Sequence, residues 1–308
     1  MKILIIQLSA LGDIIYTLHN VIKFYYSFKD NIEIDWLCNS KNELLINQKE
    51  INNLLIFKKN KIEDKYDIII DFGTKRSTLF QRYKLNGLKI GFLANKKKYI
   101  SFFNDYNINF NEKISVIENQ KNILKFLCKL LKINFNDSYN PEINYNKEIE
   151  ISINTYINIL HLTKKTIIIN PNSSKENKEL DEIDLNNLLK YFHDIDKYNV
   201  ILIGEKYGVK GKNASLYVNN NHLNIEILPK KLDKILFLGY LLEKSDLLIS
   251  PDTSILHLAE FQKVNTIGLY FKNSNKGFMS WGNIKNRKYQ VVDNFSLEDL
   301  KQNINKLL

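Results

Sequence analysis

The sequence contains few of the residues that interrupt regular structure or cross-link a chain. It has 4 prolines and 11 glycines among 308 residues, which argues against a linker-rich or disordered protein. Its 2 cysteines, Cys38 and Cys128, lie in apolar segments and form no Cys-x-x-Cys motif. We therefore expect buried thiols and a reducing compartment rather than disulfides.

Long apolar runs and the signatures of common cofactors are also missing. The apolar N-terminus, 1–6, is too short for a signal peptide, and no stretch approaches the length of a membrane span. The dinucleotide fingerprint G-x-G-x-x-G is absent, and no cluster of histidine, cysteine and carboxylate residues has metal-ligand spacing. We expect a cytoplasmic protein, free or resting on a membrane face, with no metal and no bound cofactor.

Positive charge is the main excess in the composition. The net charge is +10 and the pI is near 9.2, while 44% hydrophobic and 25% charged residues are typical of a soluble globular protein. A basic chain of this kind favours an anionic partner, which can be a nucleic acid, a membrane surface or a phosphorylated substrate. The charge alone does not choose among these three.

Apolar segments with strand character alternate with segments of helical spacing. Predicted strands are 3–8, 32–38, 54–58, 66–72, 89–93, 166–170, 200–204, 225–228, 246–249 and 266–270. Predicted helices are 14–28, 42–48, 77–85, 114–133, 149–160, 184–192, 232–243, 255–261 and 297–307. This alternation predicts an α/β fold with parallel sheets covered on both faces.

The polar stretch 134–145 breaks the alternation, which then restarts. We therefore predict two Rossmann-like domains, 1–150 and 151–308, facing a central cleft. In this prediction the final helix, 297–307, could pack either on its own domain or back on the N-terminal domain.

The first candidate site is the turn after the first strand, Ser9-Ala10-Leu11-Gly12-Asp13. Gly12 lets the backbone approach a ligand closely. Asp13 occupies the position expected for a helix N-cap, and capping is one interpretation. The other is a general base at the carboxyl edge of the sheet, facing the cleft.

Two polar loops follow strands of the C-terminal half. The loop 170–178 contains Ser173, Ser174 and Lys178, whose hydroxyl and ammonium groups suit a diphosphate. Glu205, after the next strand, could accept hydrogen bonds from a ribose or a sugar. The alternative for both loops is ordinary solvated surface.

The segment 250–259 reads Ser-Pro-Asp-Thr-Ser-Ile-Leu-His-Leu-Ala and joins a buried strand to a helix. Backbone N–H groups and a positive dipole end at such a junction bind phosphorylated ligands. Asp252 or Thr253 can cap this helix, and His257 lies one turn inside it. The alternative is a plain capped junction with one packed histidine.

A basic and aromatic segment, 96–103, includes Lys97 and Lys98. It could bind single-stranded nucleic acid or an anionic lipid headgroup. A loop with solvated lysines and buried aromatic rings is the alternative.

Several of these stretches together resemble the ADP-heptose:lipopolysaccharide heptosyltransferase family, whose members are inverting glycosyltransferases of the GT-B fold. The specific parts are Ile-x-x-Leu-Ser-Ala-Leu-Gly-Asp at 5–13 and Asp-Thr-Ser-x-x-His-Leu at 252–258. The loop 170–178 and the segment 66–73, followed by Lys75 and Arg76, add to the similarity. The resemblance spans nearly the whole chain.

The resemblance implies a role for each matching residue. Asp13 would take the proton from the acceptor hydroxyl, and Lys178 would stabilise the leaving diphosphate. Donor binding is implied for Ser173, Ser174, Glu205, Asp252, Thr253, Ser254 and His257. Acceptor binding is assigned to Ser9, Gly12, Lys75, Arg76, Lys97 and Lys98. The partners would be ADP-heptose as donor and a Kdo-lipid A or inner-core lipopolysaccharide acceptor, at the cytoplasmic face of the inner membrane.

The chain departs from the family pattern at Ser254, where the family usually has glycine. A related transferase for another nucleotide sugar, which Ser254 would permit, therefore stays open. Two further alternatives are a non-catalytic sugar-binding relative and a basic nucleic-acid-binding protein. The last has no recognised nucleic-acid-binding motif in the sequence.

Overall fold

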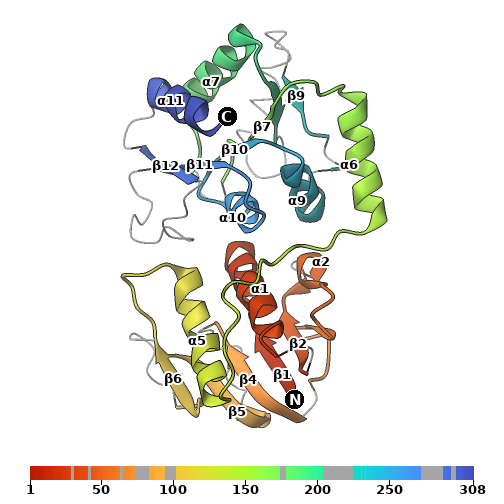
Figure 1. Cartoon of the computed structure of the whole chain (residues 1–308), viewed down its shortest axis with the longest axis vertical. Coiled ribbons are helices and arrows are strands. Elements are labelled where there is room, and N and C mark those ends of the chain that lie inside the picture. Colours follow the sequence, from red (N-terminus) through yellow and green to blue (C-terminus); the bar gives the residue numbers. More distant parts are fainter. Residues whose placement is uncertain are drawn as a thin grey trace. The chain divides into compact units, whose positions relative to one another are not determined.

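The chain forms two compact units, one of Met1–Asn144 and a second that begins at Tyr145 (Figure 1). The computed structural model describes residues 1–28, 31–40, 43–62, 65–73, 83–93, 102–173, 178–203, 225–229, 231–232, 234–271, 287–292 and 296–308. The sequence pattern led us to a division at residue 150, but helix α6 (Lys147–Ile159) packs on α9 (Ile235–Glu243) of the second unit. The change of unit therefore comes before this helix.

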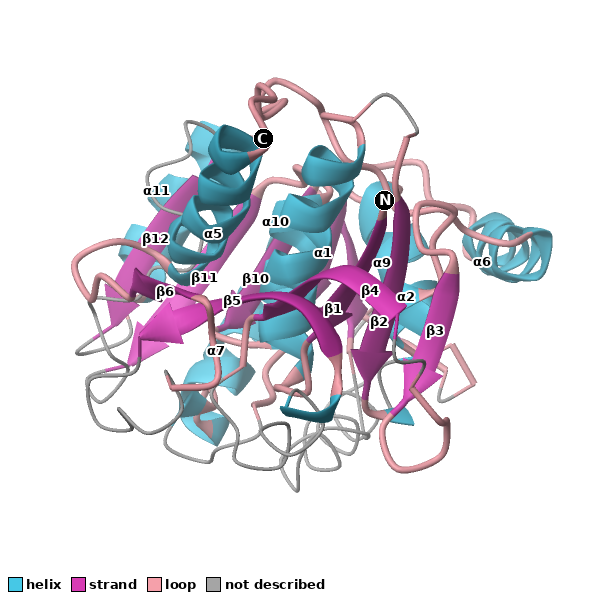
Figure 2. Ribbon diagram, turned by 90° about the horizontal axis from the view of Figure 1, so that it is seen from below, coloured by secondary structure: helices cyan, strands magenta, loops and turns pink. Residues whose placement is uncertain are grey.

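The first unit contains a parallel sheet in the order β3-β2-β1-β4-β5-β6 (Figure 2). The strands are β1 (Lys2–Ile6), β2 (Glu33–Cys38), β3 (Asn53–Ile56), β4 (Lys65–Asp71), β5 (Asn86–Leu93) and β6 (Tyr106–Asn109). After Lys2 the central strand β1 is apolar, with Ile3, Leu4, Ile5 and Ile6 at 0% exposure. The sequence analysis missed β6 because this edge strand is polar and mostly exposed.

The second unit repeats this strand order. Its parallel sheet runs β12-β11-β10-β7-β8-β9. The strands are β7 (Thr166–Ile169), β8 (Asn199–Leu202), β9 (Glu226–Ile227), β10 (Leu247–Pro251), β11 (Thr266–Phe271) and β12 (Arg287–Val292). In each sheet the first strand of the unit lies between the second and the fourth, which is the doubly wound Rossmann arrangement. The α/β prediction is confirmed.

Helices cover the sheets of both units. Those described are α1 (Leu11–Tyr25), α2 (Glu43–Ile46), α5 (Val116–Leu130), α6, α7 (Glu182–Ile195), α9, α10 (Ser254–Phe261) and α11 (Leu297–Leu307). Helices α1 and α5 pack side by side in the first unit (Figure 2). Side chains cap the N-termini of four helices where Ser, Asn or Asp precedes the first turn: Ser115, Asn146, Asp181 and Ser296.

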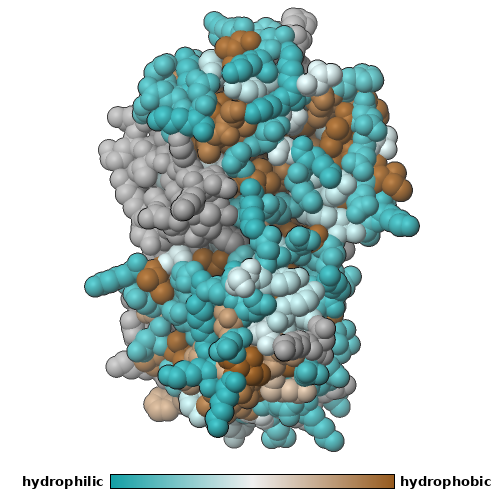
Figure 3. All heavy atoms as spheres, viewed as in Figure 1, coloured by the Kyte–Doolittle hydropathy of each residue, from teal (hydrophilic) through white to brown (hydrophobic). Residues whose placement is uncertain are grey.

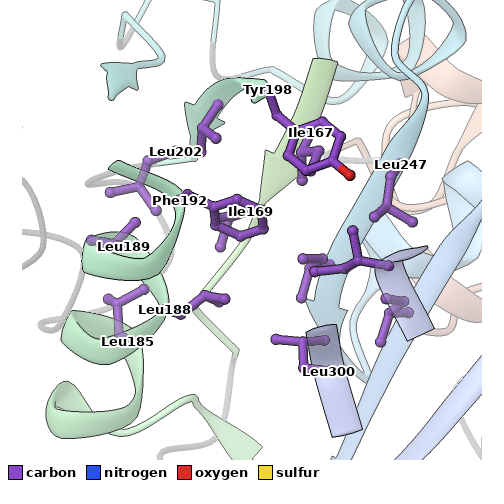
Figure 4. Packing of buried hydrophobic residues seen from close by; sticks show 14 of the residues in the cluster. Ile167, Ile169, Leu185, Leu188, Leu189, Phe192, Tyr198, Leu202, Leu247 and Leu300 are labelled. Carbon is purple, nitrogen blue, oxygen red and sulfur yellow. The ribbon is translucent and has the colours of Figure 1, made fainter. Parts of the chain in front are cut away.

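The final helix belongs to the core of the second unit. Leu300 and Ile304 of α11 are at 0% exposure and join the cluster that includes Ile169 and Leu188 (Figure 4). Its apolar stripe packs against α7 and the second sheet.

Polar residues cover most of the face shown in Figure 3, with apolar residues scattered among them. Both cysteines are buried and free, and burial raises the pKa of the Cys128 thiol to about 12. Within the described ranges, no helix has the combination of length and apolar character that a membrane span needs.

A cluster of three lysines around Asp137 ties the segment after α5 to the first unit. Asp137 Oδ2 lies 2.8 Å from Lys125 Nζ, and Oδ1 lies 3.5 Å from Lys121 Nζ and 3.6 Å from Lys23 Nζ. Burial acts to raise the pKa of Asp137, but the lysines, Lys125 first, outweigh it and lower the pKa to about 2.

We predict that Asp137→Asn destabilises the protein in a pH-dependent way. A carboxyl pKa held below its unfolded value stabilises the fold above that value, and this contribution disappears as the pH falls toward the folded pKa. At pH 7 the variant should lose about 1 kcal/mol or less of unfolding free energy, because the cluster is partly exposed. Urea unfolding at pH 7 and near pH 2 measures this; an equal difference at both pH values would contradict it.

Candidate functional site

The loops that follow β7 and β10 meet at the carboxyl edge of the second sheet. Asn170, 1% exposed, donates from Nδ2 to Ser250 Oγ at 3.0 Å and to Thr253 Oγ1 at 3.3 Å. The two hydroxyl oxygens lie 3.1 Å apart and share a hydrogen bond. Since β7 and β10 flank the point where the strand order reverses, this is the edge at which doubly wound sheets bind ligands.

Helix α10 starts at this edge without a side-chain cap. Its N-cap residue is Thr253, with extended backbone angles, but the Thr253 hydroxyl bonds to Asn170 and Ser250 and not to the helix backbone. Thr253 therefore takes the predicted N-cap position, but its side chain does not cap the helix. The first-turn N–H groups and the positive dipole end are left for an anion.

Four charged or titratable side chains form a continuous array beside this helix start. Lys178 Nζ lies 2.7 Å from Asp252 Oδ2, and Asp252 Oδ1 lies 3.5 Å from His257 Nε2. On the other side of the ring, His257 Nδ1 lies 3.6 Å from Glu260 Oε2. We call these residues the Lys178–Glu260 array. It combines a cation and a carboxylate at the surface with an imidazole behind them.

The array joins three residues that the sequence analysis selected, Lys178, Asp252 and His257, to one that it missed. Glu260 lies three residues after His257 on the same helix face, and it is an acidic residue in an otherwise apolar run. An acidic residue among apolar ones was the sequence signal that could have identified Glu260.

The other predicted donor-side residues differ in how far the structure connects them to the array. Ser254 is the first residue of α10 and is half-buried. Ser173 is buried, and its backbone N–H donates to Glu179 Oε1 at 3.2 Å. Ser174 and Glu205 lie outside the described residues.

In the first unit, Asp13 lies in the first turn of α1 and is not its N-cap. The helix begins at Leu11, earlier than the predicted residue 14, and Ala10 occupies the N-cap position. Asp13 is half-buried, as are Ser9 and Gly12 beside it. A carboxylate in the first turn still interacts favourably with the helix dipole.

A buried hydrogen-bond chain fixes the backbone at Asp13. Gln7 Nε2 donates to Thr17 Oγ1 at 3.0 Å, and Thr17 Oγ1 donates to the Asp13 carbonyl at 2.8 Å. Gln7 and Thr17 are 1% and 0% exposed. The sequence analysis missed both residues, because only the folded chain shows that Gln7, just after β1, supports the helix turn that carries Asp13.

Asp71 lies at the carboxyl end of β4, next to β1 in the sheet. It is 1% exposed, and its Oδ1 accepts a hydrogen bond from the Gly73 N–H at 2.7 Å. A Cβ at Gly73 would lie 3.3 Å from Asp71 Oδ1 and 3.7 Å from Gln7 Oε1. These oxygens therefore face the same small space at the switch point of the first sheet.

The predicted basic acceptor-side residues, Lys75, Arg76, Lys97 and Lys98, lie outside the described residues. In the described part of the chain, no three or more His, Cys, Asp or Glu side chains gather in a way that could hold a metal ion.

Comparisons with known proteins agree on one family. The sequence profile described as glycosyltransferase family 9 (heptosyltransferase) matches residues 56–305. A curated relative, lipopolysaccharide heptosyltransferase 1 of Campylobacter coli, is 30% identical over 286 residues, which cover 84% of this chain and 80% of that protein.

Solved structures with the same fold include two from E. coli. Heptosyltransferase WaaC with ADP matches with a TM-score of 0.77 and 15% identity, over 100% of both chains. ADP-heptose lps heptosyltransferase II matches with a TM-score of 0.74 and 14% identity, over 100% of this chain and 98% of that one. At these identities the structural matches show the fold.

The Asn170 network should contribute measurably to stability. We predict that Asn170→Ala lowers the unfolding free energy by about 1–3 kcal/mol, because the buried Ser250 hydroxyl and the half-buried Thr253 hydroxyl lose their shared amide donor. Urea unfolding measures the loss. The matched control is Asn199→Ala, whose amide donates to the Lys164 carbonyl at an exposed site and should change stability by about 0.5 kcal/mol or less. Equal effects of the two substitutions would contradict the prediction.

Proposed function

The chain belongs to glycosyltransferase family 9, the heptosyltransferase family, and we propose that it transfers a heptose from ADP-heptose to a lipopolysaccharide acceptor with inversion at the anomeric carbon. The name of the Campylobacter coli relative supports the lipopolysaccharide acceptor. A structure of E. coli WaaC with ADP-2-deoxy-2-fluoro heptose, 14% identical with a TM-score of 0.72, supports the donor. The acceptor that we propose is Kdo-lipid A or the inner core.

The observation that carries this proposal is the Lys178–Asp252 pair beside the uncapped start of α10. A diphosphate needs positive charge and N–H donors, and this edge of the second sheet offers an ammonium group and a helix N-terminus together. Asp252 provides oxygens that can accept hydrogen bonds from sugar hydroxyls. We therefore assign the second unit to the donor and the first unit to the acceptor.

The proposed reaction is a single displacement. The acceptor oxygen attacks the anomeric carbon while the bond from that carbon to the diphosphate oxygen breaks, and ADP leaves with the electron pair. Asp13 takes the proton of the attacking hydroxyl. Lys178 and the first turn of α10 stabilise the negative charge that develops on the leaving diphosphate, which is the role that a metal ion has in other transferases.

The remaining predicted contacts complete this assignment. Thr253, Ser254 and His257 would bind the donor near the start of α10, and Ser173, Ser174 and Glu205 would contact its diphosphate and ribose. Ser9 and Gly12 would lie beside the acceptor hydroxyl. The basic residues Lys75, Arg76, Lys97 and Lys98 would bind the anionic groups of the acceptor.

We also propose peripheral contact with the cytoplasmic face of the inner membrane, where such an acceptor is embedded. The support is the net charge of +10 together with an exposed aromatic residue, Phe102, which belongs to the basic and aromatic segment 96–103 and has 84% of its surface exposed. Cationic side chains attract anionic lipids, and an exposed aromatic ring can enter the interface.

The test of the proposed reaction is mass spectrometry of Kdo-lipid A after incubation with ADP-heptose and the protein. The wild type should add one heptose. Asp13→Asn should lower the rate by about 100- to 10,000-fold, because the general base is lost, while ADP binding measured by calorimetry is retained.

The control for this test is Asp137→Asn, which removes a carboxylate far along the chain from the assigned residues and should transfer heptose at the wild-type rate. Absence of product from wild type with either Kdo-lipid A or a heptosylated acceptor would contradict the proposal. Product with another nucleotide sugar, and none with ADP-heptose, would identify the related transferase that Ser254 left open.

Lys178→Met should weaken ADP binding about 10- to 100-fold, since a charge-assisted hydrogen bond to the diphosphate is lost. Lys164→Met is the matched control: its ammonium group also pairs with an aspartate, Asp196 at 2.8 Å, but on the exposed surface of the same unit. Calorimetry measures both affinities, and equal weakening by both lysine substitutions would count against the assignment.

Because Lys178 provides the positive charge at the diphosphate, EDTA should leave the wild-type transfer rate unchanged.

A further inference from the structure

We propose that Glu260 is a positioning residue, which holds the His257 ring so that its other nitrogen supports Asp252 when a donor diphosphate engages Lys178. This inference rests on the proposed function of the same site. It adds a role for a buried residue that has no place in the mechanism described above.

The geometry places Glu260 at the inner end of the Lys178–Glu260 array. The His257 ring lies between two carboxylates, with Nε2 3.5 Å from Asp252 and Nδ1 3.6 Å from Glu260. Side-chain exposure falls along the array from 22% for Lys178 and 24% for Asp252 to 10% for His257 and 0% for Glu260. Only the outer members are exposed enough to meet a ligand directly, and the array connects Glu260 to them through His257.

Packing does not explain an acidic residue at this position. Its neighbours on α10 are buried apolar residues: Ile255, Leu256, Leu258, Ala259 and Phe261. Burying a carboxylate costs free energy, and a well-packed apolar side chain of similar size generally stabilises a core as much or more. The position of this carboxylate beside a site histidine points to a specific role for the charge or the hydrogen-bond acceptor.

Histidine chemistry provides that role. The group that faces one ring nitrogen decides which nitrogen carries the proton and how the ring is oriented. With a carboxylate facing each ring nitrogen, a proton on both nitrogens lets Nδ1–H point to Glu260 and Nε2–H point to Asp252. Glu260 thereby holds the ring plane, which fixes the position of Nε2 next to Asp252.

The need for such support follows from the ion pair at the other end. Lys178 Nζ contacts Asp252 Oδ2 at 2.7 Å in the ligand-free protein. A donor diphosphate that binds the Lys178 ammonium draws it away from Asp252 or shares it. His257 then remains as the nearby partner that keeps the Asp252 carboxylate in place for the sugar hydroxyls.

The test replaces Glu260 by methionine, which keeps the length of the side chain and removes both the charge and the acceptor. In ring ¹⁵N NMR spectra of the protein without donor, the His257 nitrogen shifts should move from those of a ring with a proton on both nitrogens toward those of a singly protonated ring. The KM for ADP-heptose should rise about tenfold, as when the partner of a site histidine is removed, with a smaller change in kcat. Glu260→Gln retains an acceptor oxygen and should recover most of both effects.

The control is Glu50→Met, which removes another buried carboxylate, 2% exposed and bonded to the Tyr26 hydroxyl at 3.0 Å in the first unit. It should leave the His257 spectrum and the KM unchanged. Unchanged His257 shifts and KM in Glu260→Met would overturn the proposal, even if the variant is less stable. Should Glu260→Met not fold, wild-type spectra in which Nε2 of His257 carries no proton would overturn it too. The NMR result is independent of transfer, so failure of the proposed reaction is distinguishable from failure of this inference.

Discussion

The direct pairing of β7 with β10 is the constraint on which the candidate site depends. Ile169 pairs with Ile249, and the Asn170 N–H donates to the Ile249 carbonyl at 2.9 Å. Two loops separated by some eighty residues of sequence therefore leave the sheet side by side. The Asn170 amide after β7 then donates to the Ser250 and Thr253 hydroxyls at the end of β10, and Asp252 comes within reach of Lys178. Without this strand order, the residues of the array would have no reason to meet.

Much of the fold follows from the sequence because central parallel strands are buried on both faces. Segments such as Lys-Ile-Leu-Ile-Ile of β1 and Thr-Ile-Ile-Ile of β7 read as strands by their apolar character alone. The edge strands β6 and β12 could not be found in this way, because an edge strand is polar or begins with charged residues. The order of the strands in each sheet could not be predicted either, because the periodicity of apolar residues indicates which residues are buried and not which strands pair.

The site divides in a similar way. Lys178, Asp252 and His257 were predicted because they lie in motifs at strand ends, where chemistry and position are both visible in the sequence. Gln7, Thr17 and Glu260 were missed because their importance lies in a partner supplied by the fold: the Asp13 carbonyl for Thr17, and the His257 ring for Glu260. The position of Asp13 was predicted wrongly because no strong cap residue marks the start of α1, where Ala10 stands.

The repeated strand order has a consequence for how the chain folds. Each unit must bring β1 to β4, or β7 to β10, across a long stretch of sequence, and such non-local parallel pairing is slow. Both units present isoleucine-rich central strands in the same order, so an unfolded full-length chain contains two sets of similar pairing partners. Refolding from denaturant therefore competes with mispairing between the two units and with exchange of strands between chains. Synthesis on the ribosome separates the two sets in time, because Met1–Asn144 emerges and can fold before β7 exists.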